Sequence, residues 1–439
     1  MEPEALLPFA KILWEFIKLW WWVFLPFLAF PEFKWLWIFW RINDVYEPSE
    51  PRALYEFRFP QIVEQPIKAM ESVFGGFWQI YDPPNIREFW FEGKYQMNFS
   101  LELVATEGQV HFYIRIPKNA IQIIESALYS QFPGAELEEV EDYTQKVPQN
   151  IPNKEWKLWG ATFKLDKGDY YPIRTYPSFE PNQDTREEKR IDPMTIIVEA
   201  MSKLGEGEHL WIQFLCTPFG AADKSFEPYI KGGKDLIDQL VHRSSAGGPA
   251  KVPFMEDLRA AGHMATTGED TERKLVGGMQ EEQGLMAPEL RLTPGERDTV
   301  TAIEEKLSKP AFSTLIQFVY FAKVDKYFGP AKALPFSYLN QYAHVTMNFF
   351  RPLKTVKVHT IPLFFLDKRR GYLNRRKIFK SHLWRTSIFP YFPTPRFVLN
   401  IEEMASLFHF PNRITFPSGL ISRVDVKKGE APPNLPLDE

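Results

Sequence analysis

Residues 95–140, YQMNFSLELVATEGQVHFYIRIPKNAIQIIESALYSQFPGAELEEV, decide the fold of this chain. Residues 95–104 and 110–116 alternate apolar and polar side chains, which is typical of half-buried strands. Between 118 and 132 the apolar residues recur at helical spacing, and 135–140 predict a returning strand. The stretch therefore predicts a β-β-α-β unit, a small sheet with a helix on one face.

The same pattern recurs downstream. Residues 156–165 and 170–175 predict two strands, and 209–217 predict a third. Between them, Asp192-Pro193 has the form of an N-cap followed by proline at the first helical position, which favours a helix start. A second α+β unit is therefore expected.

A third unit is looser. Residues 312–324 predict a strand, the chain from Ala331 is helical or irregular, and 356–366 predict another strand. A closing helix is expected to begin at Asn400. The expected fold class is α+β, with repeated β-β-α-β (ferredoxin-like) units and an N-terminal aromatic-rich membrane helix or hairpin, rather than a doubly wound parallel sheet.

Six segments follow from these patterns. They are a membrane-associated segment (1–45), a first α+β unit (46–150), a second (151–219), a flexible Gly- and Ala-rich insertion (220–292), a third unit with a basic connector and the closing helix (293–428), and a Pro-rich tail (429–439).

The N-terminal segment is unusually aromatic. Seven of the thirteen tryptophans lie between Trp14 and Trp40, and residues 19–31 carry no charge. Exposed indole in this amount predicts contact with a membrane, and the alternative is a hydrophobic hairpin buried in a large assembly. The membrane-contacting residues are expected to be Trp14, Trp20, Trp21, Trp22, Phe24, Phe27, Trp35, Trp37 and Trp40.

Two membrane geometries are open. Pro26 and Pro31 interrupt the segment, and Glu32 and Lys34 lie inside it. It could form one kinked span, or an in-plane helix up to Phe24 followed by a proline-broken turn and a second short helix. The acidic first residues and the absence of a small-residue cleavage site argue against a secretory signal.

Composition bounds the function. The formal charge of −4 argues against a nucleic-acid binder whose whole surface is basic. Cys216 is the only cysteine, so the chain has no intramolecular disulfide or cysteine-based metal site.

Motifs for catalysis are missing from the sequence. The Gly93-Lys94 pair lacks the flanking glycines and the Ser or Thr of a phosphate-binding loop. The eight histidines show no i, i+4 pair and no H-E-x-x-H, and the acidic run 136–142 is best explained as a solvated strand edge. No catalytic, cofactor-binding or metal-binding residues are predicted, and no enzyme activity is expected.

One basic stretch stands apart. Residues 368–385, KRRGYLNRRKIFKSHLWR, contain no acidic residue. The stretch is either a solvated connector or a contact for phosphate groups, in anionic lipid or in nucleic acid. The candidate phosphate- or lipid-contacting residues are Lys368, Arg369, Arg370, Arg375, Arg376, Lys377, Lys380 and Arg385.

Five motifs, taken in order, resemble the N-terminal, membrane-proximal region of bacterial type IV secretion (conjugative DNA transfer) ATPases. They are PIKAMESVFGGF (66–77), FYIRIP (112–117), YSQFPGAELEEVEDY (129–143), DPMTIIVEAMSKLG (192–205, with Gln213 in the next strand) and NIEEMASLFHFP (400–411). The resemblance extends over about residues 54–436, with the insertion matched least. These are scaffold motifs without catalytic residues.

The resemblance implies a role beside a motor. In such ATPases a RecA-like domain with a Walker A loop would follow the Pro-rich segment, whereas this sequence stops at Glu439. Either the motor is encoded separately and docks on this body, or the chain is a stand-alone relative. We expect a non-catalytic, membrane-attached scaffold with a cytoplasmic body, which positions a separately encoded motor ATPase and could assemble with copies of itself. The alternative is a DNA- or anionic-lipid-binding module acting through residues 368–385.

Overall fold

The computed structural model describes residues 6–60, 63, 65–179, 192–241, 292–355, 367–385 and 396–411. The helices are α1 (Leu6–Trp40), α2 (Glu47–Ser49), α3 (Ile67–Trp78), α4 (Ile121–Gln131), α5 (Pro193–Ser202), α6 (Phe226–Leu240), α9 (Pro294–Ser308), α10 (Leu334–Asn340), α11 (Asp367–Trp384) and α12 (Ile401–Leu407). The strands are β1 (Arg52–Arg58), β2 (Phe99–Thr106), β3 (Gln109–Pro117), β4 (Glu136–Val140), β5 (Trp156–Leu165), β6 (Glu208–Phe219), β7 (Ala311–Lys323), β8 (Phe350–Thr355) and β9 (Phe397–Asn400).

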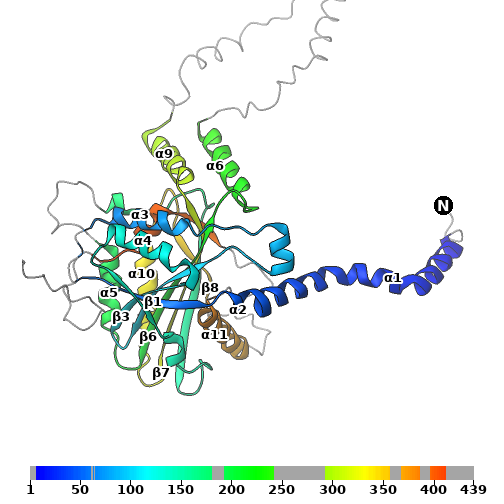
Figure 1. Ribbon diagram of the computed structural model, residues 1–439, viewed down its shortest axis with the longest axis horizontal. Helices are drawn as coiled ribbons and strands as arrows, with labels where there is room; N and C mark the ends of the chain where they lie inside the picture. Colours follow the sequence, from blue (N-terminus) through cyan, green and yellow to red (C-terminus); the bar gives the residue numbers. More distant parts are fainter. Residues whose placement is uncertain are drawn as a thin grey trace, which may run out of the picture.

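All nine strands join one antiparallel sheet (Figure 1). Its order is β4-β1-β3-β2-β6-β7-β5-β8, and β9 pairs with the first residues of β7. The order has two corresponding halves. Read inward from one edge, the first half is β4-β1-β3-β2; read inward from the other edge, the second half is β8-β5-β7-β6. In each half the fourth strand along the chain lies at the edge, followed by the first, the third and the second. The halves meet where β2 pairs with β6, from Phe99↔Cys216 to Thr106↔His209.

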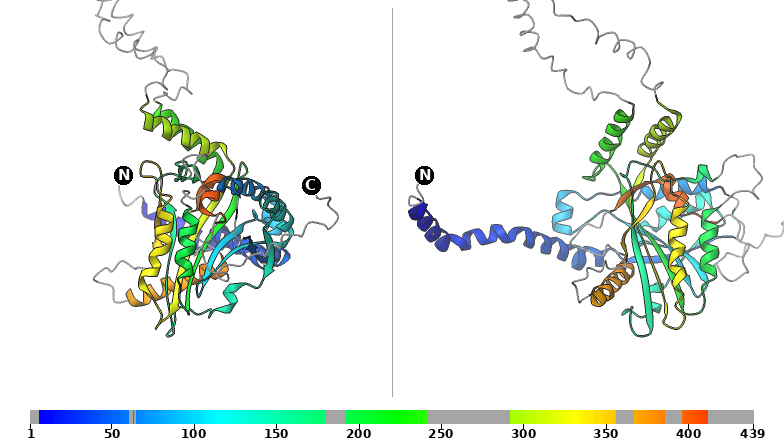
Figure 2. Two further views of the ribbon diagram at one scale, coloured as in Figure 1. Left: turned by 90° about the vertical axis from the view of Figure 1, so that its left-hand side faces the viewer. Right: turned by 180° about the vertical axis from the view of Figure 1, so that it is seen from behind.

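The sheet has an apolar face and a mixed face. Helices α3, α4, α5, α10 and α12 pack their apolar stripes onto the apolar face and form the main core with residues such as Leu101, Phe214 and Phe318. Helix α11 lies on the opposite face, where Ile378 and Phe379 contact a smaller core around Trp211 (Figure 2).

Cap residues set the helix boundaries that the sequence predicted. Asp192 accepts hydrogen bonds from the backbone N–H groups of Met194 and Thr195 at the start of α5. Asn400 forms a reciprocal capping box with Glu403 in α12. These helix starts are confirmed, as is the mixed α+β class.

The predicted strand at 170–175 is wrong. This segment forms no ladder, because the Ile173 N–H donates to the carboxylate of Glu403 and the Arg174 N–H donates to the carbonyl of Tyr342. The strand expected at 356–366 lies outside the described residues, and β8 precedes it. The strands expected in separate units, β5 and β6 in the second and β7 in the third, are neighbours in the one sheet.

Helix α1 is continuous through both prolines. Of the two geometries that the sequence left open, the one with a turn after Phe24 is therefore wrong, and so is the hairpin. Each proline removes one intrahelical hydrogen bond, and the helical backbone bonds on either side are kept. Among the described residues, no helix combines the length and apolarity that crossing a membrane requires.

Candidate functional site

Helix α1 projects from the body and exposes large apolar side chains (Figure 1). Successive residues of a helix are about 100° apart, so the four consecutive exposed residues from Leu19 to Trp22 face all sides of it. The exposed fraction is 66% for Trp14 and 44% for Trp20. Six of the predicted membrane-contacting residues are exposed in this way: Trp14, Trp20, Trp21, Trp22, Trp35 and Trp40. The side chains of Phe24 and Phe27 lie outside the described residues.

The C-terminal end of α1 is fixed to the body. The indole Nε1–H of Trp37 donates to the carbonyl oxygen of Trp90 at 2.9 Å. The Nζ of Lys34 lies 4.8 Å from the centre of the Trp90 ring, and Ile38 is buried. Trp37 therefore serves as an attachment point of the helix, and its side chain is half-buried.

Apolar surface continues from this attachment onto the body. Phe33, Leu36 and Phe39 are exposed on α1. Beside the Trp90 contact, Ile86 is 80% exposed and Phe91 is 64% exposed. Exposed apolar side chains grouped over two adjoining segments are typical of a surface that meets lipid or another protein.

Helix α11 has two distinct faces. Ile378, Ser381 and His382 are buried against the sheet. The outward stripe, at spacings of four and three, runs through Arg369, Leu373, Arg376, Lys380 and Trp384. Trp384 is 65% exposed, and the Nζ of Lys380 lies 5.6 Å from the centre of its ring. The outward face therefore combines cations with exposed apolar groups.

The eight predicted phosphate- or lipid-contacting cations differ in how exposed they are. Lys368, Arg369, Arg370, Arg375 and Lys377 are exposed, and Arg376 and Lys380 are partly exposed. Arg385 is buried, with its guanidinium bonded to the carboxylates of Glu102 and Asp142. It is not available to a phosphate group, so the prediction for Arg385 is corrected.

Arg385 belongs to a buried polar network beneath the end of α11. Glu102 also accepts hydrogen bonds from the hydroxyl groups of Tyr143 and Ser100, both at 2.6 Å. Burial tends to raise the pKa of Asp142, but the bonds from Arg385 outweigh it and hold this pKa below its ordinary value. The network keeps the charges paired and fixes the end of α11 on the sheet.

The network extends along the sheet as a chain of amides. Gln213 donates to the hydroxyl oxygen of Tyr143 at 3.1 Å and to the carbonyl of His382 at 3.2 Å. Gln317 donates to Gln213, and Ser381 donates to Gln317, both at 3.0 Å. Sequence reasoning missed this network, although spacings of four and three place positions 378, 382 and 385 on one face of a helix.

Helices α1 and α11 lie at the same end of the body. Figure 1 shows α11 next to the point where α1 leaves, and the view from behind in Figure 2 shows the same arrangement. The apolar helix and the cationic helix face are therefore on one side of the protein, away from α6 and α9.

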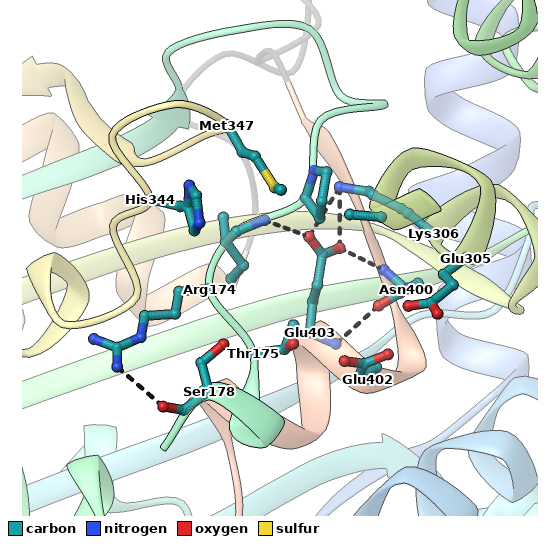
Figure 3. Close-up of a pocket in the computed structure, with 13 residues that line it drawn as sticks. Arg174, Thr175, Ser178, Glu305, Lys306, His344, Met347, Asn400, Glu402 and Glu403 are labelled. Carbon is teal, nitrogen blue, oxygen red and sulfur yellow. Dashed lines mark hydrogen bonds and ion pairs between the residues drawn. The ribbon is translucent and has the colours of Figure 1, made fainter. Parts of the chain in front are cut away.

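A small polar cavity lies on the far side of the sheet from α11. Its volume is about 130 Å³, and Figure 3 shows its lining, which includes Arg174, His344 and Asn400. At its base the Nζ of Lys306 lies 3.0 Å from each carboxylate oxygen of Glu403. Both side chains are almost fully buried, so this ion pair is a structural connection between α9 and α12.

The described part of the chain contains no group of three His, Cys, Asp or Glu side chains arranged to hold a metal ion. Cys216 is buried in β6, and burial raises its pKa to about 12, which keeps the thiol protonated and unreactive. Neither observation suggests a reaction centre in these residues.

Comparison with known proteins gives one result. A search of curated proteins finds no match. The family described as "Domain of unknown function (DUF8128)" matches residues 86–415, from the segment that holds the end of α1 to just beyond α12. Because this match covers more than half of the sequence, the chain belongs to the DUF8128 family.

Proposed function

We propose that this protein is a non-catalytic, membrane-attached scaffold of a type IV secretion or conjugation-like machine, which positions a separately encoded motor ATPase. The observation that carries the attachment is the exposure of large apolar side chains on every side of α1. Each Å² of apolar surface removed from water contributes about 25 cal/mol, so this helix is much more stable when lipid or protein covers it.

Lipid is the covering that the composition favours. Tryptophan concentrates at the boundary between hydrocarbon and water, where its ring is apolar and its N–H reaches a polar partner. Six exposed tryptophans are spread along α1, and charged residues such as Lys18, Glu32 and Lys34 are interspersed with them. We infer that α1 lies at this boundary and that the body stays on the cytoplasmic side.

The scaffold role rests on the body. The segments that resemble the secretion ATPases include α3, β3, α4 with β4, α5 and α12, which share one core or one sheet. We infer that the two halves of the sheet are repeats of a ferredoxin-like unit, since each has the strand order fourth, first, third, second. A rigid platform of this kind suits the docking of a motor domain better than it suits catalysis.

The attachment is tested by flotation of the purified protein with phosphatidylcholine vesicles. The full chain is expected to float, and a variant lacking residues 1–40 is expected to remain at the bottom of the gradient. Trp20→Ser, Trp21→Ser and Trp22→Ser together should reduce flotation, whereas Trp211→Phe, at a buried position in β6, should leave it unchanged. Flotation that is independent of α1 would contradict the proposal.

Docking of a motor is tested separately. The full chain is co-expressed with a Walker A protein encoded beside it, and the complex is isolated through a tag on the chain. Recovery of the ATPase with both the full chain and the variant lacking residues 1–40 supports docking on the body. Failure to recover any such ATPase removes this part of the proposal and leaves the attachment unaffected.

A further inference from the structure

We propose that the outward face of α11 is a second membrane contact, which binds the phosphate groups of anionic lipids while α1 occupies the apolar layer. This inference rests on the attachment through α1 and adds a lipid preference to it. Its basis is the position of α11 at the end of the body from which α1 projects (Figures 1 and 2).

The composition of the face fits lipid head groups. Arg369, Arg376 and Lys380 lie on the outward stripe, and Leu373 and Trp384 lie between and beside them. Basic residues near a membrane are attracted to anionic lipid, and a neighbouring tryptophan prefers the interface. No carboxylate in the described part of the chain forms an ion pair with Arg369 or Arg376. Arg369 is exposed and Arg376 is partly exposed with its Nε buried, so Arg369 offers the more accessible charge to an outside anion.

The opposite side of α11 holds this face in place. Ile378 and Phe379 pack on the sheet, and Arg385 joins the last turn to Glu102 and Asp142. The helix is therefore bound to the body at its C-terminal half. A cationic face held rigidly beside an apolar anchor gives the body one orientation at the membrane.

Nucleic acid is the less favoured partner for this face. The chain carries a formal charge of −4, and acidic residues such as Glu136 and Glu138 face solvent on the edge strand β4. A nucleic-acid groove would need cations over several elements, whereas here they are concentrated on one helix. Binding of DNA is kept as an outcome of the test.

The experiment measures partitioning of the full chain to two kinds of vesicle, phosphatidylcholine alone and phosphatidylcholine mixed equally with phosphatidylglycerol. The test variant combines Arg369→Glu, Arg376→Glu and Lys380→Glu. The control combines Lys224→Glu, Lys231→Glu and Lys234→Glu, which changes the net charge equally at exposed positions in and just before α6. Far-ultraviolet circular dichroism and the melting temperature check that both variants are folded.

We expect the wild type to bind mixed vesicles more tightly than neutral ones, with the difference decreasing as salt rises. Each basic residue near an anionic surface contributes about fivefold, so the test variant should bind mixed vesicles roughly a hundredfold more weakly. The control should keep most of the binding. Binding to neutral vesicles should be the same for all three proteins.

Other outcomes overturn the inference in distinguishable ways. Equal wild-type binding to both vesicles, dependent on α1, removes the role of α11 and leaves the proposed attachment intact. No binding to either vesicle removes both. If the test variant keeps its lipid binding but loses binding to a single- or double-stranded DNA probe that the control retains, the face is a nucleic-acid contact instead.

Discussion

Arg385 and Glu102 form a two-point ion pair in the interior of the protein. The Nε of Arg385 donates to Oε1 of Glu102 at 2.5 Å, and Nη2 donates to Oε2 at 3.1 Å. The two residues are 283 positions apart in the sequence, and both are buried. The pair joins the end of α11 to β2 and, together with the packing of Ile378 and Phe379, holds this helix on the body.

Arg385→Met is expected to lower the free energy of unfolding by about 3–5 kcal/mol, because it leaves the carboxylate of Glu102 buried without its cation. Urea unfolding measures this change. The control is Arg351→Met, whose ion pair with Asp166 lies at the surface and contributes at most about 1 kcal/mol. Adding Glu102→Gln to Arg385→Met should restore part of the lost stability. Equal destabilisation by Arg385→Met and Arg351→Met would contradict a structural role for the buried pair.

Lys306→Met should be strongly destabilising, by about 3–5 kcal/mol, since Glu403 is fully buried and would keep its charge or take up a proton at a cost. Lys309→Met provides the comparison three residues later on the chain. Lys309 is partly exposed and pairs with Glu71 and Glu402, so its loss should cost about 1 kcal/mol. Thermal unfolding followed by circular dichroism distinguishes the two, and a smaller effect for Lys306 would count against a structural ion pair.

Stability should fall as the pH decreases below about 6.5. Burial lowers the pKa of His382 from its ordinary value of about 6.5 to about 3. Between these two pH values, the unfolded chain binds a proton at His382 and the folded chain does not. The resulting slope is up to about 1.4 kcal/mol per pH unit. His382→Leu removes this contribution, and the loss of stability between pH 7 and pH 5 should shrink by on the order of 2 kcal/mol.

Some of that pH dependence should persist in His382→Leu. Burial also lowers the pKa of His209, to about 4, and this residue acts in the same direction. Denaturant unfolding at a series of pH values gives the two profiles. Parallel profiles for wild type and variant would show that His382 is not buried in its neutral form.

The attachment of α1 should depend on Lys34 and Trp37. Lys34→Met with Trp37→Phe removes the contact with the Trp90 ring and the hydrogen bond to its carbonyl, each worth about 1 kcal/mol. Hydrogen–deuterium exchange of residues 37–46 should then be roughly tenfold or more faster. Phe33→Leu with Trp35→Phe, both at exposed positions of the same helix, is the matched control and should leave the exchange unchanged.

Local signals in the sequence predicted much of the secondary structure. The strand at 156–165 matches β5 residue for residue, and the caps at Asp192 and Asn400 begin their helices. These features depend on neighbours within a few positions, where alternation and capping chemistry act. Residues 170–175 have the same local character, but they fail to form a strand because Glu403 and Tyr342 take their N–H groups.

The order of the strands in the sheet and the burial of individual charged residues could not be predicted from the sequence. Nothing local indicates that β5 enters between β7 and β8, since this order depends on contacts between distant segments. The run 368–385 has a uniform basic character, yet the sheet beneath it buries Arg385 and leaves Arg369 outside. For α1 the sequence left a single kinked helix and a proline-broken one open, and the structure has one continuous helix.

The strand β7 has one long neighbour and two short ones. β6 pairs along it from Ala311 to Ala322, whereas its other edge is shared by β9 at residues 311–314 and β5 at residues 317–323. During synthesis on the ribosome, the first part of that edge stays open until residues 397–400 have emerged. A nascent chain therefore carries an unfilled strand position beside β7 from the emergence of residue 323 until residues 397–400 follow, and only then can β9 fill it.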